Sequence, residues 1–226
     1  TPISPAENHY WKAKNTATLS ADGTLTGTVV IEAEGQSDAL MRRAFTRSHR
    51  SAWEDVYSQL LAAEYPGAEI VREHNTGIYD LSVPLQVTLE YRIPHFARVT
   101  GNTCRLTPLL MKNPFGDYYH APELSTNTSM ERRSYGFRQR CSRLVELEET
   151  ITLPAAMNAV AVPTDNMIMG EAASFRSHMR VEGKQLKFGA THRMEKRVYE
   201  AADWPVFRAA LKARKDLSAF PVTLSK

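Results

Sequence analysis

The sequence predicts a mainly β protein of the α+β class, with antiparallel, β-sandwich-like sheets, one long helix in the first half and a short helix near the C-terminus. Apolar and polar residues alternate in several runs, which is the pattern of strands that bury one face. One early segment instead has apolar residues at helical spacing. The 226 residues are 42% hydrophobic and 23% charged, a globular composition that excludes disordered and fibrous classes.

A β-hairpin is predicted around Asp22-Gly23. Before this dipeptide, Ala17 and Leu19 alternate with threonines, and after it apolar residues alternate with polar ones as far as Ala33. Asp-Gly readily supplies the positive φ angles of a type I′ turn, so we expect two strands joined by a tight turn.

A long helix is predicted over about residues 37–64. Ser37 is expected to cap its N-terminus, and Asp38 would lie favourably in the positive first turn. The sequence Tyr65-Pro66-Gly67 ends the helix. Its apolar positions at helical spacing are Met41, Phe45, Ala52, Val56 and Leu60.

Further strands and a second helix are predicted after this segment. Apolar residues alternate strictly with polar ones from Leu85 to Ile93, and again over residues 145–153, where Glu149 shares the apolar side. Alternating residues 175–181 and 186–194 form a second hairpin, and residues 221–224 are expected to return as a final strand. The short helix spans about residues 204–216, and its apolar stripe consists of Trp204, Phe207, Ala210 and Leu211. The residues expected in the core are Phe45, Val56, Leu89, Tyr91, Leu147 and Ile151.

The segment from Asn113 to Arg133 divides the chain. It is rich in Pro, Gly, Asn, Ser and Thr and has no apolar period, so a long surface loop or linker is predicted. Structureless runs of this length are uncommon inside a compact domain. We therefore expect two β-rich subdomains, residues 1–112 with the inserted helix and residues 113–226 with the short helix.

The net charge, the lengths of the apolar runs and the first residues of the sequence limit which classes of protein are expected. The 28 Lys and Arg residues against 25 Asp and Glu residues give a net charge of +3, which is too small to indicate a nucleic-acid partner. No apolar run is long enough to span a bilayer. The sequence begins Thr1-Pro2-Ile3 without Met or an apolar signal segment, so we expect a processed chain or an excised fragment.

No pattern of catalytic or metal-binding residues is present in the sequence. Cys104 and Cys141 stand in strand-like contexts, whereas an activated thiolate usually lies at a helix N-terminus near a His. Both are expected to be small buried residues. The seven histidines show no HxH or HExxH spacing, and CxxC, glycine-rich phosphate and GxSxG motifs are absent. We therefore expect no catalytic residue, no metal and no cofactor in this chain.

The predicted long helix carries a cluster of arginines. One interpretation is a docking surface that steers an acidic partner, and the other is an ordinary solvated helix face. If this helix has an interaction surface, its residues are Arg42, Arg43, Arg47 and Arg50.

A second basic run, Arg132-Arg133 and Arg138 to Arg143, is interleaved with Tyr135 and Phe137. Basic and aromatic residues together can bind single-stranded nucleic acid, but strand ends and edge positions also explain the run, and we expect no nucleic-acid partner. Tyr118-Tyr119-His120 raises carbohydrate stacking as an alternative to packing.

Several short motifs in the second half follow one another in a familiar order and spacing. They are Leu106-Thr107-Pro108-Leu109-Leu110, Asn113-Pro114-Phe115, Glu131-Arg132-Arg133, Ile151-Thr152-Leu153-Pro154, Val162-Pro163, Ala202-Asp203-Trp204-Pro205-Val206-Phe207-Arg208 and Val222-Thr223-Leu224. This region, from about Leu106 to Lys226, resembles the C-terminal domain of bacterial transglutaminase-like proteins. These are exported multidomain proteins, sometimes named as proteases, in which β-rich domains of unknown function precede and follow a papain-like Cys-His-Asp core.

The catalytic residues of that family match no position in this chain. The resemblance therefore implies a non-catalytic accessory or interaction module of an exported protein, in the periplasm or at the cell surface, with the catalytic core outside this chain. Its partners would be the other domains of the same polypeptide. Two alternatives stay open: an autonomous carbohydrate- or peptide-binding module, which an exposed aromatic platform would favour, and an independent hydrolase, which needs a Cys-His pair within hydrogen-bond reach.

Overall fold

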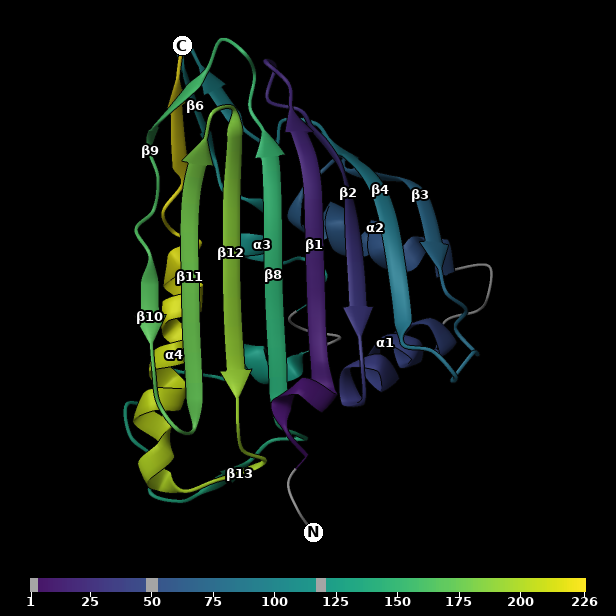
Figure 1. Ribbon diagram of the computed structural model, residues 1–226, viewed down its shortest axis with the longest axis vertical. Helices are drawn as coiled ribbons and strands as arrows, with labels where there is room; N and C mark the ends of the chain where they lie inside the picture. Colours follow the sequence, from purple (N-terminus) through teal and green to yellow (C-terminus); the bar gives the residue numbers. More distant parts are fainter. Residues whose placement is uncertain (1–3, 48–52, 117–120) are drawn as a thin grey trace.

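The computed structural model describes residues 4–47, 53–116 and 121–226, and an eight-stranded sheet forms its centre (Figure 1). Neighbouring strands in this sheet are antiparallel, except for β1 and β8 in the middle, which run parallel. From one edge to the other, the strands are β10 (Asn166–Ile168), β11 (Ala173–Glu182), β12 (Gln185–Met194), β8 (Arg143–Thr152), β1 (Tyr10–Leu19), β2 (Leu25–Ala33), β4 (Leu85–Ile93) and β3 (Glu69–Asn75).

The predicted alternation determines which face of each strand is buried. In β4 the apolar residues Leu85, Val87, Leu89, Tyr91 and Ile93 are all buried, and the residues between them are half-buried or exposed. Five of the six predicted core residues are buried, and Val56 is partly buried against the core. The opposite face is polar, and across the parallel pair it carries the ion pairs Lys12–Glu146 (2.8 Å) and Lys14–Glu148 (3.6 Å).

The first hairpin has a longer turn than predicted. Leu19 is paired with Leu25, so the five residues 20–24 connect β1 to β2. The prediction of a two-residue type I′ turn at Asp22-Gly23 is therefore wrong. The reason is local hydrogen bonding: the Asp22 carboxylate accepts the backbone N–H (3.0 Å) and the hydroxyl (3.1 Å) of Thr24, which folds these residues into the loop. The second hairpin, β11 and β12, turns at residues 183–184 as predicted.

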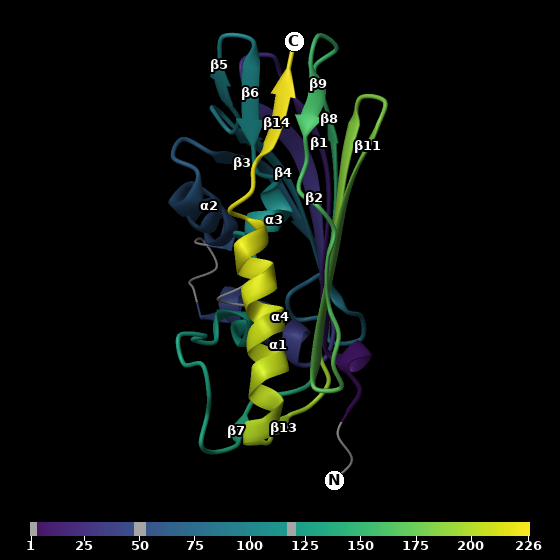
Figure 2. The ribbon, with the colours of Figure 1, turned by 90° about the vertical axis from the view of Figure 1, so that its left-hand side faces the viewer.

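The helices lie on one face of the large sheet, and α4 runs along its β10–β11 side (Figure 2). The single helix predicted over residues 37–64 is instead two helices, α1 (Gln36–Thr46) and α2 (Trp53–Glu64). The sequence from Thr46, the last residue of α1, to Ser51 contains polar residues only, so the apolar pattern that predicts one long helix is interrupted there. α3 spans Leu109–Lys112 and α4 spans Trp204–Leu217, where a helix was predicted; short 3-10 helices span Ala6–His9, Pro122–Ser125 and Ala201–Asp203.

Ser37 does not cap α1. The helix begins one residue earlier, after Gly35, whose φ of 59° favours glycine. The Ser37 hydroxyl donates a hydrogen bond to the carbonyl of His9 (2.9 Å), so it ties the helix to the chain before β1.

Two smaller sheets complete the fold. The four-stranded sheet consists of β5 (Arg98–Thr100), β6 (Thr103–Leu106), β14 (Val222–Ser225) and β9 (Asn158–Ala161), and β14 confirms the predicted final strand. A two-stranded ribbon pairs β7 (Phe137–Arg138) with β13 (Val198–Tyr199).

The prediction of a mainly β, α+β fold is confirmed. The large sheet is mixed, because β1 and β8 are parallel, and its apolar face is covered by helices. This sheet takes four strands from the predicted subdomain 1–112 and four from the predicted subdomain 113–226, so the predicted boundary separates segments that lie in one sheet.

Candidate interaction site

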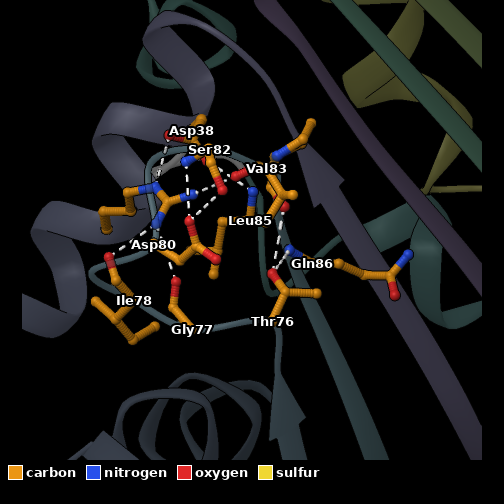
Figure 3. A network of polar contacts seen from close by, with 11 residues as sticks. Asp38, Thr76, Gly77, Ile78, Asp80, Ser82, Val83, Leu85 and Gln86 are labelled. Atoms are coloured by element: carbon orange, nitrogen blue, oxygen red, sulfur yellow. Dashed lines mark hydrogen bonds and ion pairs between the residues drawn. The ribbon is translucent and has the colours of Figure 1, made fainter.

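A buried arginine of α1 holds the connection between β3 and β4, and the loop residues that it contacts are labelled in Figure 3. Arg42 is 7% exposed, and its Nε donates to Asp38 Oδ2 at 2.7 Å. Its Nη1 donates to the carbonyls of Gly77 (3.0 Å) and Ile78 (2.8 Å), and its Nη2 donates to the carbonyl of Val83 (2.8 Å). One side chain therefore fixes three carbonyls of a single loop.

We call residues 76–84 the anchored loop. Beyond Arg42, the Asp38 Oδ1 atom accepts the backbone N–H of Leu85 (2.8 Å), so one i, i+4 ion pair of α1 holds the loop and the start of β4. Within the loop, Asp80 Oδ1 accepts the N–H of Ser82 (2.9 Å), and the Thr76 hydroxyl donates to the carbonyl of Pro84 (3.2 Å). These contacts fix the backbone of the loop at both ends and at its tip.

The anchored loop displays apolar side chains to solvent. Tyr79 is 73% exposed and Leu81 is 81% exposed, and Val83 is also exposed, whereas Ile78 is buried. Aromatic and aliphatic side chains on an ordered surface segment mark protein interaction sites, because they can be buried on binding with little loss of backbone entropy.

The predicted basic face of the helix is only partly on the surface. Arg42 is buried in the network above, so its placement on an interaction surface is wrong: the guanidinium is needed by the loop carbonyls. Arg43 and Arg47 are exposed. Arg50 lies outside the described residues.

The described parts of the segment predicted as a surface loop, residues 113–116 and 121–133, are partly buried. Phe115, Ala121 and Leu124 lie in the core, and Glu123 forms an ion pair with Arg143 (2.7 Å) in which both side chains are buried. These residues are packed into the fold, because they are apolar or supply one half of a buried ion pair. Tyr118-Tyr119-His120, the predicted aromatic cluster, lies outside the described residues.

Arg143, the last residue of the second basic run, is buried and so is not part of the surface. Besides Glu123, its guanidinium contacts the Ser37 hydroxyl and the Cys141 Sγ atom (3.3 Å). This arginine therefore joins α1, the segment 113–133 and β8 inside the molecule.

Both cysteines are free and buried, as expected. Burial raises the pKa of the Cys104 thiol, and it raises the pKa of the Cys141 thiol to about 11 although Arg143 opposes the shift. Cys104 lies in β6, and Cys141 lies in the turn before β8, so neither is at a helix N-terminus. A thiol with a raised pKa is a poor nucleophile at neutral pH.

A buried carboxyl group lies under α3. Glu149 in β8 accepts the N–H groups of Leu109 (3.0 Å) and Leu110 (2.7 Å) and an amide proton of Asn15 (3.0 Å), whose oxygen in turn accepts the hydroxyl of Tyr91 (2.8 Å). Burial raises the pKa of Glu149 to about 7, although these hydrogen bonds oppose the shift. The sequence signal was its position on the apolar side of an alternating strand.

A buried histidine lies in the neighbouring strand β12. Burial, with a smaller contribution from the Arg214 charge, lowers the pKa of His192 to about 3, so its ring is neutral at physiological pH. The described residues contain no group of three His, Cys, Asp or Glu side chains arranged to hold a metal ion.

The anchored loop was not predicted from the sequence. Asp38 and Arg42 were identified, but their partners lie 35 to 47 residues further along the chain: Arg42 donates to loop carbonyls, and Asp38 accepts the N–H of Leu85. A local signal was available: residues 75–84 hold Asn, Thr, Gly, Asp, Ser and Pro, which are turn-forming residues, around the apolar Ile78, Tyr79 and Leu81.

None of the described helices combines the length and the apolar composition that crossing a membrane requires. No curated protein matches the chain. Among solved structures, a "putative protease" from Parabacteroides distasonis is similar, with 15% sequence identity and a TM-score of 0.39. The alignment covers 46% of this chain and 20% of that protein, so this chain spans about a fifth of its length.

A family model matches residues 105–224. It is DUF3858, described as a domain of unknown function with solved-structure structure. The matched region runs from β6 through α4 to β14 and includes all seven short motifs on which the resemblance rests. Because it covers more than half of the chain, the chain belongs to the DUF3858 family.

Proposed function

We propose that this chain is a non-catalytic accessory module of an exported, transglutaminase-like polypeptide, and that its anchored loop packs against another domain of that polypeptide. The observation that carries the proposal is a contrast within one loop. Its backbone is held by the buried Arg42 and by the half-buried Asp38, while Tyr79 and Leu81 are exposed to solvent. The catalytic core would lie outside this chain.

The rigidity of the loop favours a docking role. A side chain on a fixed backbone loses less conformational entropy on binding than one on a mobile loop, so more of its buried apolar area contributes to affinity. A covalently tethered neighbour also needs little intrinsic affinity, because its effective concentration is high. A small apolar contact through Tyr79, Leu81 and Val83 is therefore sufficient for an intramolecular partner.

Positive charge on the helix that anchors the loop fits the same partner. Arg43 and Arg47 are exposed on α1, the helix that also carries the anchoring Arg42. A partner surface with an apolar centre and acidic residues at its rim would match the loop and these two arginines.

The chemistry of the thiols supports the non-catalytic part of the proposal. A papain-like nucleophile needs an accessible thiolate, and burial disfavours the thiolate of both Cys104 and Cys141. The export of the parent polypeptide to the periplasm or cell surface rests on the family resemblance.

Hydrogen–deuterium exchange compares the isolated chain with the complete natural polypeptide. Docking should slow amide exchange over residues 77–83 in the longer protein, because local opening of a covered loop becomes rarer. Replacing Tyr79 and Leu81 by Ser should remove this extra protection without changing the unfolding of the isolated chain. The turn at Gly101-Asn102, which is exposed elsewhere on the surface, is the control segment.

Two results would overturn the proposal. One is equal exchange over residues 77–83 in both proteins, and the other is a natural polypeptide that has no further folded domain.

A further inference from the structure

The β7–β13 ribbon has one buried and one exposed side. Phe137 is paired with Tyr199, and their rings stack with centroids 4.7 Å apart against Phe207 on α4. The other pair, Arg138 and Val198, is exposed. The aromatic side of the ribbon therefore packs on α4, and Arg138 and Val198 on its other side are exposed to solvent.

The loop before the ribbon is fixed to the same helix. The Arg133 guanidinium lies over the Trp204 ring at 4.0 Å and over the Phe137 ring at 4.6 Å. The Trp204 Nε1 atom donates to the carbonyl of Met130 (3.0 Å), and the Arg208 Nε atom donates to the carbonyl of Thr128 (2.9 Å). This ordered loop presents Tyr135, which is 85% exposed.

The exposed side of these segments is strongly basic. Residues 130–140 and 197–199 contain five arginines and a single acidic residue, Glu131. Four of these arginines are exposed, and within the described residues none of the four forms an ion pair: Arg132, Arg138, Arg140 and Arg197. The backbone N–H of Gln139 donates to the carbonyl of Arg197 (2.8 Å), which brings the two arginine-bearing segments together.

We propose that this surface binds an acidic polypeptide segment. We call it the arginine patch, and it consists of Arg132, Tyr135, Arg138, Arg140, Arg197 and Val198. Carboxylates of the partner would pair with the guanidinium groups, and its apolar side chains would pack on Tyr135 and Val198. The patch is separate from the anchored loop, so this inference does not depend on the proposed function.

The composition of the patch favours a polypeptide over a nucleic acid. Single strands are bound by several aromatic side chains that stack successive bases along a basic groove. Here Tyr135 is the exposed aromatic residue of the patch, and its other apolar residue, Val198, is aliphatic and more than half exposed. Tyrosine and arginine are both enriched in protein interfaces.

Binding can be measured by fluorescence anisotropy with a labelled short peptide of alternating glutamate and leucine. The neutral control is the same peptide with glutamine in place of glutamate, and a single-stranded oligothymidine is the nucleic-acid probe. We expect the acidic peptide to bind best and added salt to weaken it, because the arginines are exposed.

Variants locate the site. Arg138→Glu/Arg197→Glu should weaken peptide binding by about tenfold or more, since two attractive pairs become repulsive. Arg98→Glu/Arg105→Glu is the matched control, because these arginines are also exposed and lie opposite each other on β5 and β6, at the other end of the molecule from the ribbon (Figure 2). Tyr135→Ser should weaken binding while leaving its salt dependence unchanged. Circular dichroism confirms that each variant is folded.

Three results would overturn the inference. They are tighter binding of the oligothymidine than of the acidic peptide, no preference for the acidic peptide over the glutamine peptide, and an equal loss of binding in the Arg98→Glu/Arg105→Glu control.

Discussion

The guanidinium of Arg42 lies within hydrogen-bond distance of the Asp38 carboxylate and of the Gly77, Ile78 and Val83 carbonyls. A buried charge is tolerated only when its partners compensate for the lost hydration. Removing it would leave Asp38 without its cation and three carbonyls without a donor.

We therefore expect Arg42→Ala to lower the free energy of unfolding by about 3–5 kcal/mol, the cost typical of breaking a buried ion pair by deleting one partner. Arg43→Ala, at the exposed neighbouring position, should change it by about 0.5 kcal/mol or less. Urea denaturation of both variants provides the comparison. Equal effects at the two positions would mean that the Arg42 network contributes little to stability.

Glu149 and His192 give stability opposite dependences on pH. Between about 4.5 and 7, the folded state keeps the Glu149 proton that the unfolded state has released, so stability falls as pH rises. Between about 3 and 6.5, the unfolded state binds a His192 proton that the folded state refuses, so stability falls as pH falls. Each slope reaches about 1.4 kcal/mol per pH unit, and the two cancel where they overlap.

Single substitutions should reveal each slope between pH 4.5 and 6.5. In Glu149→Gln only the His192 contribution remains, so stability should rise with pH more steeply than in the wild type. In His192→Gln only the Glu149 contribution remains. As pH rises, the free energy of unfolding of this variant should therefore fall relative to that of the wild type. Urea unfolding at several pH values measures both, and other titrating groups are common to all three proteins. Parallel pH profiles would show that these two side chains titrate normally.

Strands β4 and β8 derive their stability from their inward faces. Leu89 and Ile151 are fully buried in the common core, so replacing either with Ala removes buried methyl groups and leaves a cavity. The free energy of unfolding should fall by about 2–5 kcal/mol for each variant. The control is Lys14→Ala on the exposed face of β1, where a change near zero is expected. A loss at Leu89 and Ile151 no larger than at Lys14 would contradict the assignment of the buried face.

Elements were predictable where the sequence period alone determines them. The long strands β4, β8 and β12 and the stripe of α4 are read directly from alternation or helical spacing. β3 was not predicted, because it is an edge strand without a fully buried residue and its sequence shows no alternation. The break between α1 and α2 was missed because Phe45, Ala52 and Val56 keep helical spacing across a polar segment.

At the scale of the whole molecule, the candidate surfaces depend on contacts between distant segments. The anchored loop needs α1 to meet the β3–β4 connection, and the arginine patch needs residues 130–140 to meet residues 197–199. The sequence alone identifies the clusters of arginines, but it does not indicate which arginines are buried. Arg42 and Arg143 are buried and hold other segments in place, whereas Arg43 and Arg138 are exposed.

We expect the isolated chain to have no peptidase or transamidase activity, because burial keeps both thiols protonated at neutral pH. Peptide hydrolysis and amine-transfer assays should give background rates for the wild type, Cys104→Ala and Cys141→Ala alike. Turnover that disappears when either cysteine is replaced would identify a catalytic thiol and refute the accessory-module proposal.

The parallel pairing of β1 with β8 also constrains the order in which the chain can fold. β1 ends at Leu19 and β8 begins at Arg143, so during synthesis β1, β2, β3 and β4 leave the ribosome long before the central partner of β1 exists. Until then, β1 is an unprotected edge with an apolar face, a template on which a second nascent chain can pair. Closing such a long loop also slows folding. A chain truncated before Arg143 would therefore be prone to aggregation, and in the cell the period between the synthesis of β1 and β8 is when a chaperone is most needed.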